Sequence, residues 1–566
     1  MASLQALWHL GQQWLANGHL ALALSIIWSL YLVLVGAWIL LQRRAPVATI
    51  GWLLSMAVLP VVGLLVYFVF GPRRFRRQRL KRLRSRRKAR MRRQSLAHLR
   101  DRAAQAPARL QQLVRLVSNA TQLPLSTAQE VQLLVGGART FDAIVHAIGQ
   151  AQHHVHLEYY IFEPDTTGQR VLQALTERAQ AGVQVRLLVD ALGSKRLGRR
   201  HYQALLDAGA EVALFHPPKL GRRLRPVINF RTHRKIVVID GTLGFTGGVN
   251  ITDTEDKRLQ ADPCHAYHDI HLRLQGPVVS WLQHVFLEDW AYALDYRHPA
   301  MPQDFAALLP PQDDGPALAQ IMASGPDSPL EAIHRVFVDA CYAAHQRLWL
   351  ATPYFVPTEA ALLALTSAAL RGVDVRVLVP ERSDSLLVTC AARSYFDELL
   401  ECGVKVYLYQ KRMLHAKTMV VDDMLGMVGT ANFDTRSFRL NYEVCALVYT
   451  PVFAQQLADQ FSRDLAQAER IFEHRSQPLP QRLAMRWRGS FRPCCKPLFS
   501  NQNQAQPCLK PLSCGTTTKP SVPIHAVIAP RNLPPSAPIC SCAKLANRWC
   551  CFANPHPTIC PAPRPV

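Results

Sequence analysis

The sequence predicts an α/β fold of two similar halves, preceded by two apolar helices. A polar cassette occurs twice, as "THRKIVVIDGTLGFTGGVN" from Thr232 and as "LHAKTMVVDDMLGMVGTAN" from Leu414. Each cassette follows the same alternation of helical and strand-like segments, which is typical of a sheet flanked by helices. A chain of 566 residues is long enough for both copies. We therefore interpret the chain as an internal duplication.

Two apolar segments near the N-terminus predict a transmembrane hairpin. Residues 20–41 and 46–70 contain no Lys, Arg, Asp or Glu, and each can cross about 30 Å of hydrocarbon as a helix. A signal peptide fits poorly, because positive charge is missing ahead of the first segment and a second segment follows at once. A buried soluble hairpin normally keeps a polar face. We expect an N-terminal segment at 1–19 and two transmembrane helices within 20–72.

The positive charge of the chain is concentrated beside these helices. Lys and Arg number 65 against 40 Asp and Glu, a net charge of +25, and "RRFRRQRLKRLRSRRKARMRR" fills residues 73–93. Such a block beside a membrane anchors to anionic lipid and keeps the following chain in the cytoplasm. Nucleic acid is the alternative partner for a basic block, and its position beside the apolar segments argues against that reading. Residues 73–125 are expected to form a basic juxtamembrane segment and connector.

The two halves are expected at residues 126–320 and 321–475. The runs "VRLLVD" and "VRVLVP", one in each half, are continuously apolar, which is typical of strands covered on both faces. Residues 476–566 differ, since they are rich in Pro and Cys and show no sustained helix or strand period. We expect this tail to be disordered. A frameshifted or read-through terminus is an alternative source of its composition, and its cysteine spacing is weak evidence for zinc.

Both cassettes place chemistry-bearing residues at the same spacing. Each follows the pattern H-x-K-x(4)-D and ends, after a glycine turn, on an asparagine: His233, Lys235, Asp240 and Asn250 in the first, His415, Lys417, Asp422 and Asn432 in the second. Residues i and i+2 of a strand share a face, so each histidine projects beside its lysine. A single His-x-Lys is usually surface decoration, but the repetition in matching context indicates one site built from both copies.

Two histidines, two lysines and two amides suit a phosphodiester. The lysines and amides would stabilise the charge that develops on the phosphate oxygens. One histidine can attack phosphorus while the other protonates the leaving alkoxide and then activates the incoming alcohol. Because the lysines supply positive charge, this chemistry requires no metal and no cofactor.

The cassettes resemble the HKD motifs of the phospholipase D superfamily. The apolar hairpin together with "YHDIHLRLQGPVV", "ATPYFVP" and "NFDTRSFRLNYEV" resembles bacterial cardiolipin synthases over roughly residues 20–475. The resemblance implies two pseudo-symmetric phospholipase D-type halves, each a mixed sheet flanked by helices, that form one catalytic unit. The tail lies outside it.

The resemblance also implies roles for individual residues. His233 and His415 would be nucleophile and general acid/base in an order that the sequence leaves open. Lys235 and Lys417 would bind phosphate with help from Asn250 and Asn432. An acid beyond each motif would orient its histidine, which points to Asp269 and Glu443. Asp240 and Asp422 would act more by holding local structure, and Tyr159, Tyr160, Tyr354 and Phe355 would line a lipid pocket or pack in the core.

The implied activity is cardiolipin synthesis from two phosphatidylglycerol molecules through a phosphatidyl-histidine, in the inner membrane of a bacterium with the catalytic unit on the cytoplasmic side. The expected partners are phosphatidylglycerol and other anionic lipid, with no nucleic acid. A phospholipase D-type hydrolase, a transferase using another alcohol or lipid, a nuclease and a non-catalytic membrane scaffold are the alternatives. The two apolar spans argue against the nuclease, and the intact residues of both cassettes argue against the scaffold.

Overall fold

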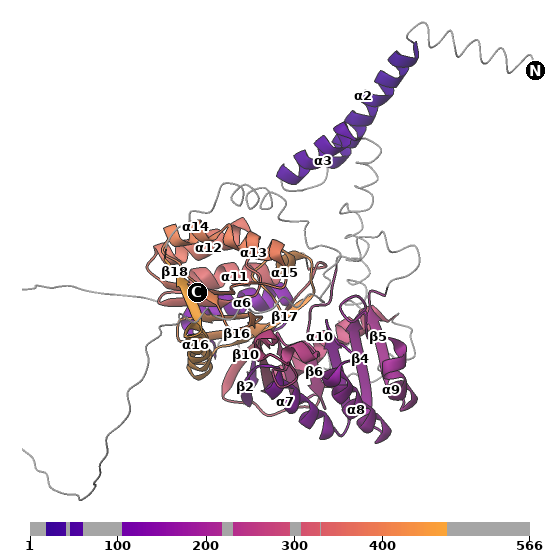
Figure 1. Ribbon diagram of the computed structural model, residues 1–566, viewed down its shortest axis with the longest axis vertical. Helices are drawn as coiled ribbons and strands as arrows, with labels where there is room; N and C mark the ends of the chain where they lie inside the picture. Colours follow the sequence, from indigo (N-terminus) through magenta and orange to yellow (C-terminus); the bar gives the residue numbers. More distant parts are fainter. Residues whose placement is uncertain are drawn as a thin grey trace, which may run out of the picture. The chain divides into compact units, whose positions relative to one another are not determined.

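The computed structural model describes residues 19–40, 46–59, 105–217, 230–294, 307–328 and 330–472. The basic block at 73–93 and the tail beyond residue 472 lie outside these residues, so the expectations for them remain predictions. Both cassettes lie in the same compact unit. Within it the predicted α/β fold of two halves is confirmed, and Figure 1 shows the halves as a magenta and an orange block.

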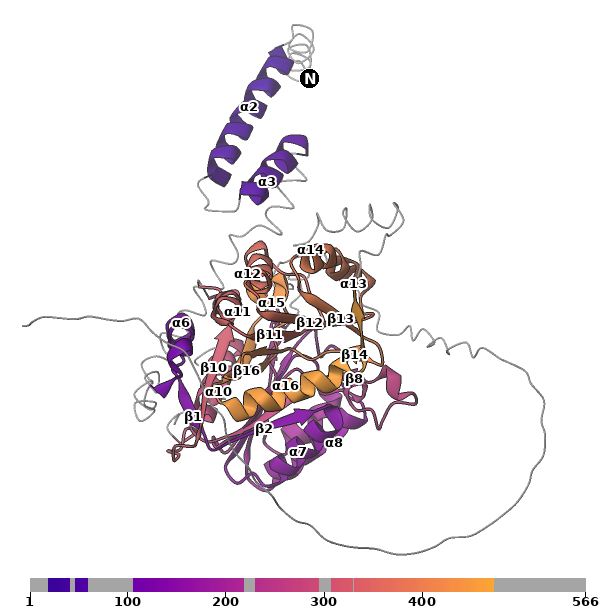
Figure 2. The same cartoon turned by 90° about the vertical axis from the view of Figure 1, so that its left-hand side faces the viewer.

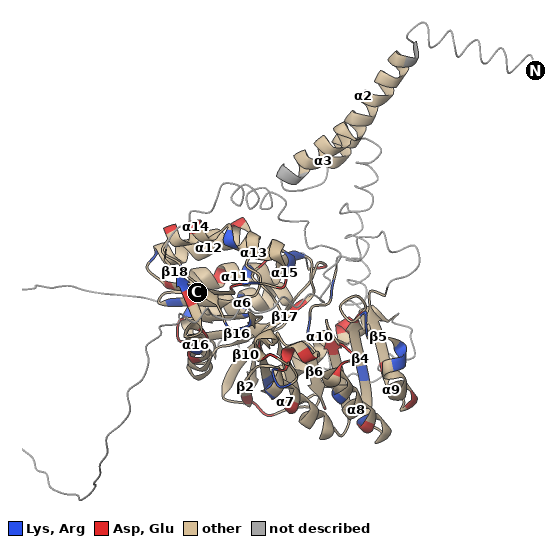
Figure 3. Ribbon diagram, in the orientation of Figure 1, with Lys and Arg blue, Asp and Glu red and all other residues tan. Residues whose placement is uncertain are grey.

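The predicted hairpin begins with α2 (His19–Leu40) and α3 (Pro46–Val58). Figure 3 shows neither Lys, Arg, Asp nor Glu on either helix. Residues Ala21–Ile39 of α2 are long and apolar enough to cross a membrane, and the two helices bury Ile39 and Met56 against each other. The rest of the second apolar segment lies outside the described residues, so α3 supports only part of the second span.

The first half contains a seven-stranded mixed sheet. Its strands are β2 (Glu130–Val135), β3 (His154–Tyr159), β4 (Gln184–Asp190), β5 (Glu211–Phe215), β6 (Ile236–Ile239), β7 (Leu243–Gly247) and β9 (Ile270–Gln275). They lie in the order β2-β9-β7-β6-β3-β4-β5. Strands β3, β4 and β5 are parallel, and the others pair antiparallel. The helices are α7 (Gly137–Gly149), α8 (Thr166–Gln180), α9 (Gln203–Asp207) and α10 (Val278–Ala293).

The second half repeats this arrangement in a nine-stranded sheet. Its strands are β1 (Ser126–Ala128), β10 (Ala317–Ser324), β11 (Arg347–Ala351), β12 (Asp374–Pro380), β13 (Lys405–Tyr409), β15 (Thr418–Val421), β16 (Leu425–Gly429), β17 (Glu443–Val448) and β18 (Ala468–Ile471). The order is β1-β10-β17-β16-β15-β11-β12-β13-β18. The helices are α6 (Gln111–Thr121), α11 (Ala332–Ala343), α12 (Glu359–Leu370), α13 (Leu386–Arg393), α14 (Phe396–Glu401), α15 (Thr435–Arg439) and α16 (Pro451–Leu465).

Strand β1 joins the sheet of the second half although it lies at the start of the expected first half. It pairs antiparallel with β10, which pairs with β17. We expected the halves to divide at residues 126 and 320 because the repeated sequence divides there. The pairing of β1 with β10 depends instead on hydrogen bonds between segments that are far apart in the chain.

A continuous apolar core joins the two halves. One cluster of buried residues contains Val238 and Trp290 of the first half together with Val428 and Val444 of the second. Figure 2 shows α7 and α8 below the strands of both halves and α12 and α14 above them. Because burial of apolar surface is the main stabilising term in folding, the halves stabilise each other as one unit.

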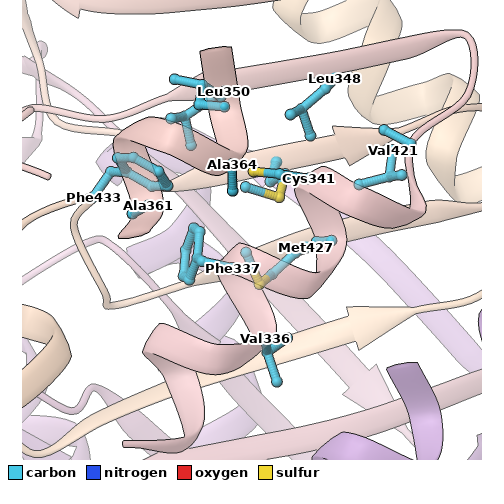
Figure 4. Close-up of a cluster of buried hydrophobic side chains, with 14 of the residues drawn as sticks. Val336, Phe337, Cys341, Leu348, Leu350, Ala361, Ala364, Val421, Met427 and Phe433 are labelled. Carbon is cyan, nitrogen blue, oxygen red and sulfur yellow. The ribbon is translucent and has the colours of Figure 1, made fainter. Parts of the chain in front are cut away.

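The outer core of the second half shows how helices cover its sheet. Figure 4 shows Phe337 and Cys341 of α11 and Ala361 of α12 facing Leu348 and Met427 of the strands. Small residues on α12 allow its backbone to lie close to the sheet and to α11. This packing fixes β11 and its partner β15, which lies within the second cassette.

The junction between the halves is built by exchanged backbone pairing. Strand β14 (Met413–Leu414) pairs parallel with β8 (Tyr267–His268), and Thr232 pairs parallel with Tyr442 in the equivalent place. Each segment that enters a cassette therefore lies against the other half. We expected His233 and Lys235 to lie on a strand, but strand β6 begins later, at Ile236, because the preceding residues pair across this junction.

Candidate active site

The two histidines lie where the exchanged backbone segments meet. The His233 N–H donates to the Tyr442 carbonyl at 2.8 Å, and the His415 N–H donates to the His268 carbonyl at 2.8 Å. The side chains of His233 and His415 are 8% and 6% exposed. The backbone of each histidine is therefore held by a residue of the other half, which is Tyr442 for His233 and His268 for His415.

His415 contacts a carboxylate and a lysine. Its Nδ1 lies 2.6 Å from Asp269 Oδ2, and Lys417 Nζ lies 3.1 Å from the same oxygen and 2.9 Å from His415 Nδ1. Lys417 Nζ also donates to the His415 carbonyl. All three side chains are buried, so their charges interact with little screening by water.

Burial and these neighbours shift the pKa values of the group in opposite directions. Burial alone would raise the pKa of Asp269, but the charges of Lys417 and His415 hold it at about 2. Burial and the positive charge of Lys417 lower the pKa of His415 to about 4, against the attraction of Asp269. In the unliganded site at neutral pH, Asp269 is therefore ionised and the His415 imidazole is neutral.

His233 contacts a carboxylate in a different setting. Its Nδ1 lies 2.9 Å from Glu443 Oε2 and 3.1 Å from the Thr430 carbonyl. Glu443 also accepts from the Thr430 hydroxyl at 2.5 Å and from the Asn441 amide at 3.0 Å. Burial raises the pKa of Glu443 to about 7, although the Thr430 hydroxyl and the Lys235 charge favour the ionised form.

Each histidine is held by an acid from the other half. Glu443 belongs to the second half and contacts His233 of the first, whereas Asp269 belongs to the first half and contacts His415 of the second. We expected both acids from the sequence, but the expectation tied each one to the motif that precedes it. The exchange follows from the crossed backbone pairing at the junction.

The two lysines form one positive centre. Lys235 is fully buried and its Nζ donates to the His233 carbonyl at 2.9 Å. Burial and the charge of Lys417 lower the pKa of Lys235 to about 7, while Glu443 and Asp269 oppose this shift. The two ammonium groups therefore repel each other, and a phosphate between them would relieve this repulsion.

The asparagines lie buried beside this centre. Asn250 and Asn432 are 3% and 2% exposed, and in the described part of the chain neither side-chain oxygen has a hydrogen-bond partner. The Asn250 backbone N–H donates to Glu255 Oε1 at 3.1 Å, and the Asn432 N–H donates to the Ser437 hydroxyl at 3.1 Å. The two amides thus occupy equivalent places supported by different side chains.

Glu255 is a buried site residue that our sequence analysis missed. Its Oε1 lies 3.8 Å from His415 Nδ1, and its Oε2 has no hydrogen-bond partner among the described residues. Burial and the charge of Asp269 raise the pKa of Glu255 to about 8. One signal could have found it, because Glu255 follows Asn250 at the spacing by which Ser437 follows Asn432.

Three of these residues have the types and spacing of metal ligands. Glu255, Asp269 and His415 each offer a ligand atom, and these atoms lie within 4.8 Å of one another. Lys417 Nζ contacts Asp269 and His415 Nδ1, so a cation of the protein already neutralises the Asp269 carboxylate. His415 Nδ1 is also engaged with Asp269, which disfavours its use as a ligand.

The aspartates of the cassettes lie away from the histidines. Asp240 accepts the backbone N–H groups of Gln152, His153 and His154 at 2.7–2.8 Å. Asp422 accepts in the same way from His345, Gln346 and Arg347 at 2.7–3.2 Å. Both have a φ of 51°, a left-handed conformation that Asp tolerates better than most residues. They close the turn after the cassette strand and tie it to the start of β3 or β11.

The four predicted pocket aromatics divide between core and site. Tyr159 and Phe355 are buried in apolar clusters. The ring of Tyr160 lies 4.8 Å from that of His233, and the Tyr354 hydroxyl donates to Asp384 at 2.8 Å. A further aromatic, Tyr267, lies 5.2 Å from the His415 ring.

A fold of two such halves with one shared histidine–lysine centre is that of the phospholipase D-like class. The family described as "Cardiolipin synthase, PLD-like domain" matches residues 144–289 and 338–465. The family described as "Phospholipase_D-nuclease N-terminal" matches residues 26–72, which include most of both apolar segments.

Relatives of this chain identify the family within the phospholipase D-like class. A cardiolipin synthase of Geobacillus sp. (strain WCH70) is 40% identical over 462 residues, which cover 80% of this chain and 90% of that protein. One from Halalkalibacterium halodurans is 39% identical over 458 residues, with the same coverage. The chain belongs to the cardiolipin synthase family. The crystal structure of phosphatidylserine synthase from Haemophilus influenzae Rd KW20 shares the fold, with a TM-score of 0.50 and 17% identity over 66% of this chain and 97% of that chain.

Proposed function

We propose that this chain is a cardiolipin synthase that transfers the phosphatidyl group of one phosphatidylglycerol to the terminal hydroxyl of a second. Membership of the family supports the activity. The observation that supports this mechanism best is the pair of buried imidazoles, each with Nδ1 at a carboxylate. That contact orients the ring and directs the phosphorus chemistry to Nε2.

The reaction proceeds through a covalent intermediate. Nε2 of one histidine attacks phosphorus, a P–N bond forms, and the bond from phosphorus to the glycerol oxygen breaks. The other histidine gives its proton to the departing glycerol. It then takes the proton of the terminal hydroxyl of a second phosphatidylglycerol, whose oxygen displaces the histidine from phosphorus. The products are cardiolipin and glycerol, and no nucleotide is consumed.

The lysines and asparagines stabilise the charge on the reacting phosphate. Lys235 and Lys417 are preorganised in a buried site, where a fixed positive charge stabilises a transition state more than it would in water. Asn250 and Asn432 orient the phosphate oxygens. Asp269 and Glu443 position the histidines, while Asp240 and Asp422 position the cassette strands. Because the lysines supply the charge, we propose that the reaction needs no metal ion.

We further propose that both apolar segments span the bacterial inner membrane and that the catalytic unit faces the cytoplasm. The charge-free α2 and α3 and the basic block that follows them support this topology. A reporter that is active only in the periplasm, fused after residue 105 or within the first 19 residues, is expected to stay inactive in both positions. Activity of either fusion contradicts the hairpin topology.

Product analysis tests the proposed reaction directly. Purified full-length protein in detergent–phosphatidylglycerol micelles with EDTA is expected to form cardiolipin and glycerol in equal amounts. His233→Ala and His415→Ala are each expected to lower the rate by about 10³-fold or more. His146→Ala, which removes an exposed histidine of α7, is the matched control and keeps full activity.

Other products would identify the alternatives. Phosphatidic acid with glycerol but without cardiolipin means that water is the acceptor and the protein is a hydrolase. A phosphatidyl ester that forms only with another added alcohol or lipid means a different transferase. Loss of cardiolipin formation in EDTA, with recovery on adding a divalent ion, would refute the metal-free mechanism.

A further inference from the structure

A buried arginine lies on the same side of the backbone as the first histidine and lysine. Arg231, His233 and Lys235 alternate in sequence with Thr232 and Arg234, whose side chains contact Glu158 and Asp289. The two sets therefore project to opposite sides of the backbone. The segment is held by the Thr232–Tyr442 pairing and by a hydrogen bond from the Thr232 N–H to Asp190 Oδ2 at 3.1 Å. Arg231 is only 8% exposed.

The guanidinium of Arg231 has no ion-pair partner within 4.0 Å in the described part of the chain. The nearby carboxylate is Asp190, whose Oδ1 accepts from the N–H groups of Leu192 and Gly193 and whose Oδ2 accepts from Thr232. Burial lowers the pKa of Arg231, against the attraction of Asp190. A buried charge without a close counter-ion is costly, and a bound anion would offset this cost.

A second arginine reaches the same place from the other half. Arg436 lies on α15, four residues after Asn432, and is half-buried. Its positive charge lowers the pKa of Arg231, and the charges of both arginines lower the pKa of the Tyr160 hydroxyl, against the dominant effect of burial. The Tyr160 ring in turn lies 4.8 Å from that of His233, tilted by 55°. The backbone also brings them together, because the Asn441 N–H donates to the Arg436 carbonyl at 3.1 Å and the adjacent Tyr442 N–H donates to the Arg231 carbonyl at 2.8 Å. Both arginines therefore lie beside the His233 side of the centre.

The two arginines have no charged equivalents in the other copy of the duplication. Counting from the histidine, the second cassette has Met413 where the first has Arg231. Counting from the asparagine, the first half has Thr254 where the second has Arg436. The equivalent positions beside His415 are therefore neutral, so the extra positive charge does not follow from the repeated chemistry of the cassettes.

We propose that Arg231 and Arg436 form a second phosphodiester-binding subsite, which holds the phosphate of the acceptor phosphatidylglycerol. This inference rests on the proposed function. Lys235 and Lys417 hold the phosphate that reacts, whereas the second phosphate remains intact and becomes the other phosphate of cardiolipin. One glycerol joins the two phosphates of the product, so the two subsites must be adjacent. Arginine suits an unreactive phosphodiester, because its planar guanidinium binds two phosphate oxygens.

A neutral acceptor separates this subsite from the reaction centre. Ethanol carries no phosphate, so transfer from phosphatidylglycerol to ethanol uses the reacting-phosphate site alone. We would measure cardiolipin and phosphatidylethanol formed together in micelles of phosphatidylglycerol with added ethanol. The product ratio does not depend on how much of a variant is folded.

The expected result is a selective loss of the lipid acceptor. Arg231→Gln and Arg436→Gln each lower the ratio of cardiolipin to phosphatidylethanol by about tenfold or more, with an unchanged rate of phosphatidylethanol formation per folded enzyme. Arg231→Lys keeps the charge and retains part of the ratio. Arg115→Gln, on the exposed face of α6, is the matched control and leaves the ratio at the wild-type value.

Three results would overturn the subsite. An unchanged ratio in both glutamine variants means that neither arginine binds the acceptor phosphate. An equal loss of both products means that the arginines act on the donor or on folding. A wild-type protein that forms phosphatidylethanol but no cardiolipin would refute the lipid acceptor, and with it the subsite, while leaving phosphatidyl transfer intact; one that forms neither product would refute the proposed function itself.

Discussion

The two halves of the molecule share a backbone plan but differ in the electrostatics of their histidines. His415 lies against Asp269, whose pKa is about 2, and its own pKa is about 4. His233 lies against Glu443, whose pKa is about 7. The cassettes that produce both environments have the same pattern of His, Lys, Asp and Asn.

This difference shows that a duplicated strand pattern does not produce duplicated charge states. Asp269 is ionised because Lys417 lies 3.1 Å away. Lys235 instead donates to a backbone carbonyl, and Glu443 depends more on the neutral donors Thr430 and Asn441. Each buried group also feels the charges of the other copy, so the centre behaves as one coupled set. Such asymmetry suits a reaction that needs two unlike histidines.

The largest expected difference between the halves is in the loss of kcat when the acid that orients each histidine is replaced by its amide. Asp269→Asn is expected to lower kcat by about 10²- to 10⁴-fold, because the amide cannot hold the His415 tautomer in the same way. Glu443→Gln is expected to cost less than about 10²-fold, because Glu443 is already partly protonated at neutral pH. Steady-state cardiolipin formation checks the order, and equal or reversed losses contradict the electrostatic difference.

The pH profile sharpens the comparison of the lysines. The pKa of Lys235 is about 7, so its positive charge is lost as the pH rises through this value. We expect kcat/KM for phosphatidylglycerol to fall above about pH 7–8 and kcat to fall at higher pH, because bound phosphate favours the charged lysine.

Two variants identify the group behind this alkaline limb. Arginine keeps its charge throughout this pH range, so Lys235→Arg should remove the fall of kcat/KM at alkaline pH. Glu443→Gln should retain this fall. A wild-type kcat/KM that stays flat up to pH 9 would contradict the low pKa of Lys235.

The aspartates of the two cassettes accept the same kind of backbone hydrogen bonds, so the two halves should respond alike when these residues are substituted. Asp240→Ala and Asp422→Ala each remove the acceptor of three backbone N–H groups and place alanine at positive φ. We expect each to lower the free energy of unfolding by about 2–4 kcal/mol while the activity per folded enzyme is kept. Asparagine at either position should recover part of the loss. Thermal unfolding with active-enzyme titration separates this result from a direct catalytic role.

The smallest expected effect concerns Glu255 and its counterpart Ser437. Burial and the charge of Asp269 raise the pKa of Glu255 to about 8, above the ordinary value of about 4.3. The folded state therefore binds more protons than the unfolded state between these values, and the Glu255 contribution to stability falls as the pH rises. Glu255→Gln should raise the unfolding temperature at pH 8 by about 2–4 °C and leave it unchanged at pH 4.

Ser437→Ala is the comparison in the other half. It removes the acceptor of the Asn432 N–H, at a cost of about 1 kcal/mol. The Ser437 hydroxyl also favours the ionised form of Glu443, so this cost should be larger at pH 8 than at pH 4, whereas Glu255→Gln stabilises the protein at pH 8. A pH-independent effect of Glu255→Gln would show that the Glu255 carboxyl is not protonated more readily in the folded state.

Much of the fold could be predicted because its signals are local. The strand runs, the intervening helices and the repeated cassettes lie within short stretches, and the first apolar segment forms a helix long enough to span a membrane. The start of β6 at Ile236 and the entry of β1 into the second sheet escaped prediction. Both depend on backbone pairing between segments that are far apart in the chain.

The residues of the site likewise divide into those that local spacing predicts and those that depend on long-range pairing. His233, Lys235, His415 and Lys417 could be found from the repeated spacing alone. The crossed pairing of Asp269 and Glu443 could not, because it depends on which half each exchanged segment pairs with. Glu255 resembles an ordinary loop carboxylate in the sequence apart from its spacing from Asn250, and its burial is seen only in the fold.

The central claim is that both halves share one reaction centre and that only one of the two histidines becomes covalently modified. Rapid quenching of the enzyme during turnover of phosphatidylglycerol, followed by peptide mass spectrometry under conditions that preserve phosphohistidine, tests it directly. We predict at most one phosphatidyl adduct per chain, always on the same one of His233 and His415, and its accumulation when the other histidine is replaced by alanine. An adduct on both histidines, or none on either during active turnover, would contradict a single shared centre with one nucleophile.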